Sequence, residues 1–449
     1  MPVVEERPHS PHVDKLPHID THPIGESLME RPERFVGLRL MFLFVATYLT
    51  HGIATQFGLI AQPLQYWLMK DLHMSAAQVS SYLAIMMLPW FLEGAYGVIC
   101  DFVPLFGYRR KGYLLAGNLL AGLAFAAITG TSSLAVVFTA LVLSAIGISI
   151  SIAVTAGLAV CEGKVDGKIG DYLVVQMVCY YATLIASGVV GGLLCQYLAP
   201  KSALHSAAGI SATAAVLVAC LVPWLHREEK SHMNMQRLRE TWASLKAAFR
   251  CRPLQLAAVF IACWCFSPSF GVPLYFHESN ALGFSQQTIG QLFGWNSAGM
   301  LLGAALYWRL IKSTALRSQL YTAVAVGTTS TLAYLLLSSP VSAIALELFR
   351  GTANMIALLT IRTLAAAVCP KHIEVAVMAS LFAVWDLATD GSTYIGGQIF
   401  SNVFHNQFAP LVLVAACATA LCALLVPFLC APAQEEISAA QPNKVLTRV

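Results

Sequence analysis

Apolar stretches long enough to span a lipid bilayer recur along the chain between short polar breaks. A spanning helix needs roughly 20 consecutive, mostly apolar residues. The pattern supplies such stretches at 37–61, 77–100, 113–130, 133–160, 172–197, 203–225, 254–276, 287–310, 318–337, 341–368, 375–401 and 410–430. It therefore predicts an all-α membrane protein with twelve transmembrane helices.

The composition agrees with this prediction, since 57% of the 449 residues are hydrophobic and only 11% are charged. Soluble domains carry roughly 25% charged residues. The twelve cysteines are scattered through apolar segments without a C-x-x-C pair, which indicates small buried hydrophobes. We find no catalytic, metal or cofactor motif, and therefore expect neither an enzyme nor a bound metal or cofactor.

The loop charges predict how the chain is oriented, because cytoplasmic loops are enriched in lysine and arginine. One set of loops carries nearly all of the cations: Arg31, Arg34, Arg39, Arg109–Lys111, Lys164, Lys168, the segment 226–252, Arg309, Lys312, Arg317, Lys371, Lys444 and Arg448. The opposite loops carry Lys70 and Lys201. We expect both termini in the cytoplasm, in a plasma membrane or bacterial inner membrane. The net charge of +4 comes from cations in short loops, so it bears on how the chain is oriented in the membrane. We expect no nucleic-acid partner.

Two polar segments flank and divide the apolar pattern. Residues 1–36 are rich in proline and acidic residues and contain His9, His12, His18 and His22. We expect a disordered cytoplasmic tail, and weak metal binding is the less favoured alternative. Residues 226–253 form a charged linker that is partly an amphipathic helix, and a regulatory role is the alternative to a plain linker. The expected bundles are 37–225 and 254–431, followed by a cytoplasmic tail at 432–449.

The two predicted bundles resemble each other in sequence. At an offset of 210, Pro63-Leu64, Tyr66, Leu72, Ser75 and Val79 align with Pro273-Leu274, Phe276, Leu282, Ser285 and Ile289. The end of the first helix and the start of the second are thus repeated in the seventh and eighth. Two parallel six-helix repeats joined by a cytoplasmic loop form the arrangement of major-facilitator transporters, with substrate between the halves.

The segment 89–113, PWFLEGAYGVICDFVPLFGYRRKGY, joins an apolar helix to a basic loop. Small residues permit close helix approach, and an acid at the helix end can pair with an arginine of the loop. We expect a conformational latch formed by Gly97, Asp101, Gly107, Arg109 and Arg110.

Pro89-Trp90, Gly97, Asp101, Pro104, Gly107, Arg109-Arg110 and Tyr113 of this segment match a pattern typical of the folate/biopterin transporter family. The stretches 273–307 and 369–386 resemble further signatures of that family. The resemblance covers most of the chain from about residue 37, and it implies a major-facilitator fold and proton-coupled transport of a pterin or folate-like solute. Two departures weaken the substrate inference: Glu93-Gly94 replaces a Lys-Pro pair, and Asp386 and Asp390 stand where the family is polar but uncharged.

Asp386 and Asp390 are the most informative acids, because an ionisable residue near a helix centre costs about 2.5–3.5 kcal/mol on insertion scales. Four residues apart, they share one helix face and cannot both ionise cheaply. We expect them to bind substrate and carry the coupling proton, with Glu93 as a further proton site. Permanent pairing with an arginine of another helix is the alternative interpretation.

Arg350 is the candidate cation of the binding site, and Glu347 precedes it by three residues. Its guanidinium either binds a substrate carboxylate in bidentate fashion or is neutralised locally by Glu347. The sequence leaves both interpretations open.

A polar stripe on the first helix, including His51, and the nearby Gln56 must face something polar, most simply a central cavity. The prolines of 267–273 predict a break in the seventh helix, which is tolerated at membrane depth where it lines a cavity. Pro63 occupies the related place in the first helix. Trp90, Trp264, Trp295 and Trp385 are candidates for stacking on a flat heterocycle, although most such residues serve packing.

These observations predict a monomeric secondary transporter or symporter that moves a small molecule across the bilayer by alternating access. Alternatives are a major-facilitator permease for a muropeptide, acyl-coenzyme A or siderophore-like solute, and a transporter-like receptor that does not translocate.

Overall fold

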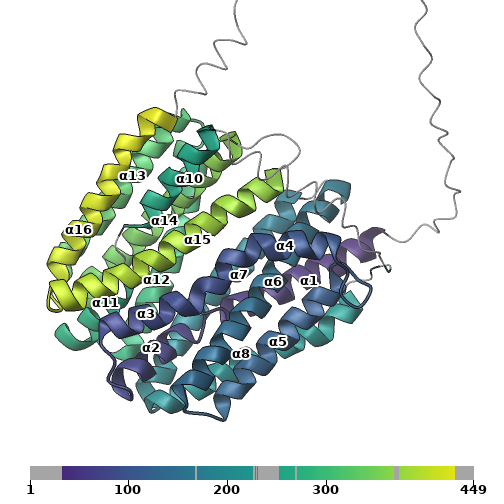
Figure 1. Cartoon of the computed structure of the whole chain (residues 1–449), viewed down its shortest axis with the longest axis horizontal. Coiled ribbons are helices and arrows are strands. Elements are labelled where there is room, and N and C mark those ends of the chain that lie inside the picture. Colours follow the sequence, from purple (N-terminus) through teal and green to yellow (C-terminus); the bar gives the residue numbers. More distant parts are fainter. Residues whose placement is uncertain are drawn as a thin grey trace, which may run out of the picture. The chain divides into compact units, whose positions relative to one another are not determined.

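The structure is a computed structural model that describes residues 33–166, 169–225, 228, 230, 252–267, 270–368 and 374–429. By internal contacts the chain divides into residues 1–38 and residues 39–449. In the second unit the described residues form helices and no strand beyond an isolated bridge between Leu105 and Tyr108 (Figure 1). The expectations for the two tails and for the amphipathic part of the linker lie outside the described residues.

We call residues 39–225 the N-terminal half and residues 252–429 the C-terminal half. The helices of the N-terminal half are α1 (Glu33–Ala54, which begins in the first unit), α2 (Ala61–Lys70), α3 (Ala76–Met87), η1 (Leu88–Leu92), α4 (Glu93–Phe102), α5 (Lys111–Thr129), α6 (Leu134–Asp166), α7 (Ile169–Tyr197) and α8 (Pro200–Leu225). Those of the C-terminal half are α10 (Arg252–Cys265), α11 (Gly271–Phe276), η2 (His277–Ala281), α12 (Gln286–Leu306), η3 (Tyr307–Ile311), α13 (Leu316–Ala333), η4 (Tyr334–Leu336), α14 (Pro340–Val368), α15 (Glu374–Gln398), η5 (Ile399–Val403), α16 (Phe408–Leu421) and η6 (Cys422–Leu425).

Six segments among the described residues are helices long and apolar enough to cross a membrane by length and composition. They are Lys111–Thr129, Leu134–Ala159, Asp171–Tyr197, Pro200–Leu225, Pro340–Ala365 and Phe408–Leu429. The other predicted spans contain helices that are shorter, interrupted or more polar. The continuous helix expected at 37–61 is one of these, because α1 ends at Ala54 and α2 begins at Ala61.

The interruption predicted in the seventh helix is present, since α10 ends at Cys265 and α11 begins at Gly271. Pro63 and Pro273 each occupy the third position of the short helix that follows the break. A proline in the first turn removes no intrahelical hydrogen bond, so each short helix can start there. The two prolines are separated by the repeat offset of 210 residues, and the breaks are therefore related in sequence as well as in form.

Close helix crossings depend on glycines that leave no room for a side chain. A Cβ built at Gly299 or Gly303 of α12 would collide with the backbone of α14 at Leu348 or Thr352, and Gly351 of α14 meets the α12 backbone in the same way. Gly299 and Gly303 are four residues apart, the spacing that brings membrane helices into backbone contact. This crossing holds the C-terminal half together.

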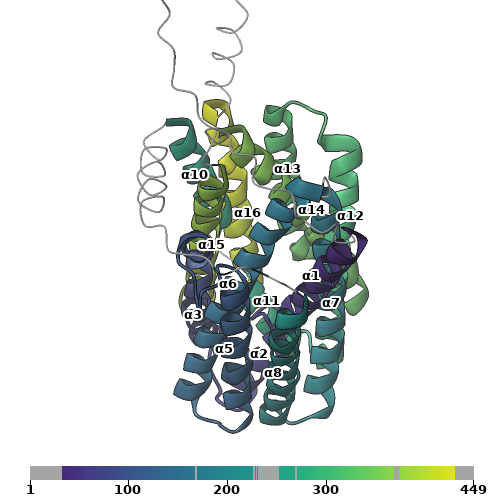
Figure 2. The same cartoon turned by 90° about the vertical axis from the view of Figure 1, so that its right-hand side faces the viewer.

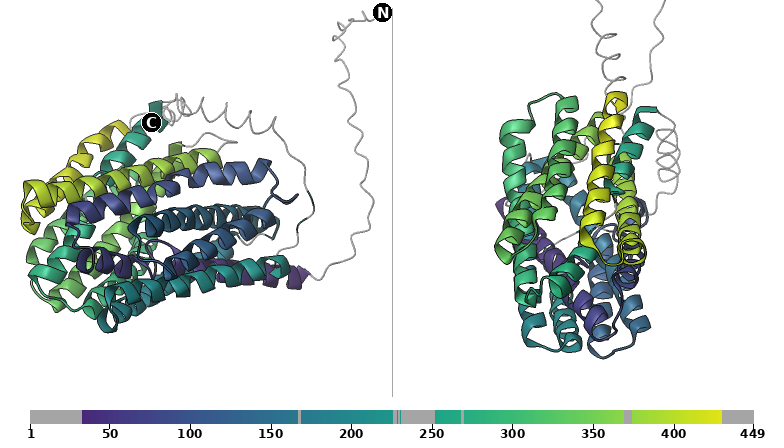
Figure 3. Two further views of the ribbon diagram at one scale, coloured as in Figure 1. Left: turned by 60° about the horizontal axis from the view of Figure 1, so that its bottom comes forward. Right: turned by 90° about the vertical axis from the view of Figure 1, so that its left-hand side faces the viewer.

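The two halves contact each other along two pairs of helices, α3 with α15 and α7 with α12 (Figures 1 and 2). The left view of Figure 3 shows α3 and α15 running side by side. Hydrogen bonds link Ala77 to Ser401, and Gln398 to Ser81. A Cβ at Gly290 of α12 would lie 2.6 Å from the Cα atom of Gly192 in α7. α15 also contacts η1 and α4 of the N-terminal half.

The 103–110 turn between α4 and α5 supplies part of the predicted latch. Gly107 has a φ of 83°, a conformation that favours glycine. The backbone N–H groups of Arg109, Arg110 and Lys111 donate to the carboxylate of Glu228 at 2.8–3.2 Å. Glu228 thus binds the positive end of α5.

The remaining latch residues lie around this turn. A guanidinium nitrogen of Arg110 lies 4.0 Å from the carboxylate of Glu162. A Cβ at Gly97 would make only ordinary contact, 3.8 Å from Ala153. The side chain of Asp101 lies outside the described residues, so its expected pairing with an arginine stays a prediction.

We predict that Glu228→Ala destabilises the protein by roughly 1–3 kcal/mol, because three backbone donors at the start of α5 lose a charged acceptor. The thermal unfolding midpoint in detergent should fall accordingly. Glu162→Ala is the matched control, since its carboxylate is 40% exposed and 4.0 Å from Arg110. An equal fall in both variants would show that the backbone hydrogen bonds of Glu228 contribute nothing specific.

Candidate functional site

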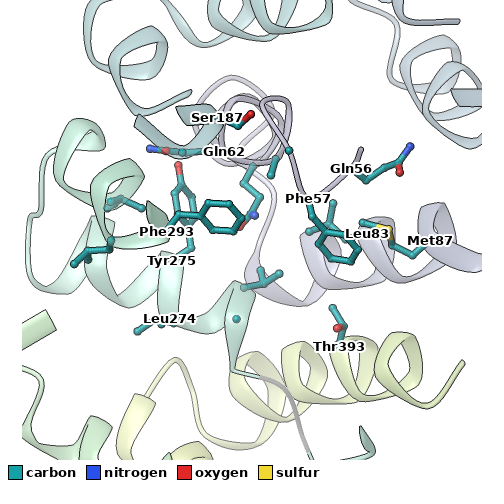
Figure 4. A pocket seen from close by; sticks show the side chains of 18 of the residues that line it. Gln56, Phe57, Gln62, Leu83, Met87, Ser187, Leu274, Tyr275, Phe293 and Thr393 are labelled. Atoms are coloured by element: carbon teal, nitrogen blue, oxygen red, sulfur yellow. The ribbon is translucent and has the colours of Figure 1, made fainter. Parts of the chain in front are cut away.

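A cavity of about 510 Å³ lies between the two halves. The N-terminal half lines it with residues of the α1–α2 connection, α2, α3 and α7, and the C-terminal half with residues of α11, η2, α12, α14 and α15 (Figure 4). The volume lies in the range of sites for small organic molecules. Its polar lining comprises Gln56, Gln62, Gln65, Ser187, Tyr275, Glu278, Glu347, Arg350, Asn354, Thr389, Asp390 and Thr393.

Both helix interruptions open onto this cavity. Residues 56–59 of the first break line it, as do Gly271 and Val272 just after the second. The backbone at the first break is satisfied locally, because the N–H of Leu59 donates to the carbonyl of Ile53 at 3.0 Å. Irregular backbone at membrane depth occurs where it lines a cavity. The interruptions therefore position polar groups where a continuous helix would present a regular apolar face.

Gln56 connects the cavity to two of the predicted site residues. Its amide nitrogen donates to Ser144 Oγ at 3.1 Å and to the carbonyl of Leu141 at 3.2 Å. Its amide oxygen accepts a hydrogen bond of 3.0 Å from Trp90 Nε1. The Trp90 ring in turn stacks on His51 with centroids 6.0 Å apart. His51 and Trp90 thus support Gln56 from behind, and of the three only Gln56 lines the cavity.

Arg350 and Glu347 form an ion pair of 2.8 Å in the C-terminal half. The second carboxylate oxygen of Glu347 accepts a hydrogen bond from the Tyr334 hydroxyl. The guanidinium also lies over the rings of Phe270 and Tyr334, 6.0 and 5.7 Å from their centroids. Local neutralisation by Glu347 is therefore present. Arg350 Nε is nevertheless buried without a partner, and this N–H stays available to a ligand.

Asp386 and Asp390 are one turn apart on α15 and act on each other electrostatically, but only Asp390 lines the cavity. Asp390 is buried, lines the cavity and has an oxygen, Oδ2, without a hydrogen-bond partner. Asp386 is absent from the cavity lining and lies within electrostatic reach of Glu93. Arg362 of α14 acts on Glu93 as well. Neither aspartate forms an ion pair with an arginine among the described residues.

None of the four predicted tryptophans lines the main cavity. Trp264 lines a smaller neighbouring cavity of about 270 Å³ that shares Arg350, Asn354 and Thr389 with the main one. Trp385 packs against the core of the C-terminal half, and Trp295 is 42% exposed. Phe57, Tyr275 and Phe293 supply the aromatic lining instead (Figure 4).

Sequence reasoning missed Gln65, Glu278 and these three rings as site residues. Gln65 stands three residues after Gln62 on the helix that follows the first break, and its Oε1 is buried without a partner. Glu278 lies inside the 273–307 stretch that carries the family resemblance. The described residues contain no group of three or more His, Cys, Asp or Glu that could hold a metal ion.

A helical membrane protein with a polar cavity between two halves, at paired helix interruptions, resembles solute transporters of the major-facilitator type. Solved structures share this fold: a D-xylose-proton symporter (TM-score 0.65, 14% identity, 87% of this chain and 96% of that chain) and the nucleoside transporter NupG in a D323A mutant (TM-score 0.66, 11% identity, 88% and 99%).

Within this class, the chain belongs to the BT1 family, whose profile matches residues 51–444. It is 24% identical over 417 residues to the folate-biopterin transporter of Synechocystis sp., covering 87% of this chain and 81% of that protein. It is also 24% identical over 367 residues to folate transporter 2 of Plasmodium falciparum, covering 78% of each. The predicted family is confirmed. The chain is an integral membrane protein that transports a small molecule, and its relatives are transporters, not enzymes.

Gln56 and Gln65 make a matched pair for testing the cavity. Gln56→Ala breaks three hydrogen bonds and should destabilise the protein by roughly 1–3 kcal/mol, because Trp90 loses its acceptor. Gln65→Ala removes a buried oxygen that has no partner, so it should leave stability nearly unchanged while weakening ligand binding. Thermal unfolding with and without an added solute that the protein transports measures both effects. A greater stability loss in Gln65→Ala than in Gln56→Ala would contradict these roles.

Proposed function

We propose that this protein is a proton-coupled secondary transporter of a pterin or folate-like solute. Two six-helix bundles, 37–225 and 254–431, move against each other in a twelve-span arrangement joined by the 226–253 linker. The observation that carries the proposal is the cavity between the halves, in which Asp390 Oδ2, Gln65 Oε1 and Arg350 Nε are buried without partners. Such groups are expensive to bury unless a ligand satisfies them.

The chemistry of these groups suits a pterin ring. A carboxylate accepts two hydrogen bonds from the ring N–H and amino group of an aminopyrimidinone, a task we assign to Asp390. The Gln65 oxygen accepts from a further ring donor, and Arg350 Nε donates to a carbonyl or carboxylate oxygen. Figure 4 shows Phe57 and Phe293 entering the cavity from opposite halves, where either ring can stack on a flat heterocycle. The relatives named above as folate-biopterin and folate transporters support this substrate class.

Proton coupling follows from the unpaired acids. Asp390 in the cavity, and Asp386 with Glu93 behind it, place three carboxylates in a region where closing the cavity around net charge is costly. Protonation removes that charge and lets the bundles reorient. We assign substrate binding and proton coupling to Asp390, and proton coupling to Asp386 and Glu93.

The experiment that tests this function is uptake of labelled biopterin and folate into liposomes that contain the purified protein, with and without an inward proton gradient. We expect gradient-stimulated uptake of at least one of them. Asp390→Asn should weaken substrate affinity by roughly ten- to a hundredfold, because it exchanges a charge-assisted hydrogen-bond pair for a neutral one.

Asp386→Asn serves as the matched variant. It lies outside the cavity, so it should weaken the response to the gradient more than the affinity. Equal losses of substrate affinity in the two variants would show that Asp386 and Asp390 do not differ in substrate binding, against this assignment. Failure to take up either compound, in liposomes where another solute is transported, would remove the pterin from the proposal.

Alternating access requires the α7–α12 contact to separate. Gly290→Val should wedge these helices apart, because even a Cβ at Gly290 would lie 2.6 Å from Gly192 Cα and 2.9 Å from Gln62 Oε1. The variant should populate a cavity open at the face opposite the basic loops. A cysteine placed at Ser187, in a background without the native cysteines, should then react faster with an impermeant maleimide added outside.

Gly157→Val is the control for this prediction, since beyond its chain neighbours and the adjoining backbone of its own helix no atom lies within 4 Å of a Cβ built there. Unchanged labelling in Gly290→Val, with uptake at the parent rate, would show that the α7–α12 contact does not gate the cavity.

A further inference from the structure

Glu278 is an acid of the cavity that the proposed function leaves without a role. It lies in the π-helical segment η2, a geometry often found at functional sites. Its side chain is 4% exposed and lines the cavity. Its backbone carbonyl accepts a hydrogen bond from the N–H of Phe284, whereas no described residue offers its carboxyl group a hydrogen bond or an ion pair.

Arg350, the cation that acts on Glu278 electrostatically, is already engaged. Arg350 forms its ion pair with Glu347, and Tyr334 completes the hydrogen bonding of that carboxylate. Arg350 and Glu347 are therefore electrically neutral as a unit. One guanidinium cannot neutralise two buried carboxylates, so an ionised Glu278 would leave one negative charge in excess. A buried charge without compensation costs several kcal/mol.

The other ionisable groups on the elements around Glu278 do not supply a second cation at its carboxyl group. The His277 ring stacks on Phe408 with centroids 4.8 Å apart, and the Lys70 ammonium donates to Asn280 at 3.4 Å. Tyr275 donates to Gln286 at 3.0 Å, and α12 contains no charged residue. The groups that act on Glu278 electrostatically are Tyr275, Tyr334, Glu347 and Arg350.

We propose that Glu278 binds a transported proton, and that the Arg350–Glu347 pair beside it makes closure of the cavity depend on this proton. The inference deepens the proposed proton coupling and rests on it. With the proton bound, Glu278, Glu347 and Arg350 together carry no net charge, and the halves can close. When the cavity opens to the other side, the carboxylic acid O–H dissociates and its proton passes to water there. The carboxylate that remains faces Arg350, whose Nε–H has no other partner.

This scheme explains why an arginine with a complete ion pair keeps one donor unused. The pair with Glu347 fixes the guanidinium, and Nε–H stabilises either a substrate oxygen or the ionised Glu278. Substrate binding and proton release are then linked, because the substrate oxygen and the ionised Glu278 compete for the same donor, Arg350 Nε–H. In the empty carrier an ionised Glu278 adds one uncompensated negative charge to the cavity, and this charge opposes reorientation until a proton returns.

The first test is Glu278→Gln in liposomes, measured as the ratio of biopterin uptake with and without an inward proton gradient. We expect the stimulation by the gradient to disappear in this variant, while exchange of labelled for unlabelled biopterin remains measurable. Glu278→Asp should restore part of the stimulation because it keeps a carboxyl group. Asp390→Asn, the matched carboxyl-to-amide change in the same cavity, should be distinguished by its loss of affinity. Undiminished stimulation in Glu278→Gln would overturn the proposal.

The second test needs no substrate and therefore separates this inference from the pterin assignment. Infrared difference spectra of the substrate-free protein report protonated carboxyl groups by their C=O stretching band. At neutral pH we expect a band that is absent in Glu278→Gln and shifted in Glu278→Asp. Identical bands in all three proteins would show that Glu278 is ionised, and the proposal would fail even if biopterin is transported. If Glu278→Gln does not fold, the shift in Glu278→Asp decides the question.

Discussion

The structure depends on the rule that backbone N–H and C=O groups inside a bilayer must find partners within the protein. A helix supplies these hydrogen-bond partners at every residue. At an interruption, other protein groups or cavity water must supply them. The chain interrupts α1–α2 and α10–α11 at related positions, before Pro63 and Pro273, and both interruptions open onto one cavity. The location of the site is thus a consequence of where the backbone can depart from helix.

The same constraint shapes the polar side chains of the cavity. In the N-terminal half Gln56 is fully hydrogen-bonded and fixes the rings behind it, so it serves as a support. In the C-terminal half Glu347 is fully paired and fixes Arg350. Each half therefore has at least one satisfied polar residue that holds the lining in place. The unsatisfied atoms, on Gln65, Arg350 and Asp390, are the ones left to a ligand.

The sequence predicted the all-helical class, the family and the break in the seventh helix, because these follow from hydropathy, spacing and proline chemistry, which are local properties of the chain. It predicted one continuous first helix where the structure has α1 and α2 with a break between them. It also singled out Arg350 and Asp390, which line the cavity, and their roles in binding stay predictions. It did not separate Asp390 from Asp386, since four residues on a helix share a face but differ by one turn in depth. This difference of one helical turn decides whether the carboxylate lines the cavity, as in Asp390, or lies near Glu93, as in Asp386.

The aromatic lining could not be predicted for a related reason. Tryptophan was the natural candidate for stacking, yet Trp90 is held by Gln56 and Trp385 packs in the core, while Phe57 reaches the cavity from an irregular connection. Helical periodicity says nothing about where a side chain points once the helix has ended. Two of the residues that periodicity missed, Phe57 and Glu278, lie in the α1–α2 connection and the π-helical segment η2, and the other three lie in α2, α11 and α12. In a membrane transporter, departures from regular helix are therefore the first places to search for residues that touch the solute or the proton.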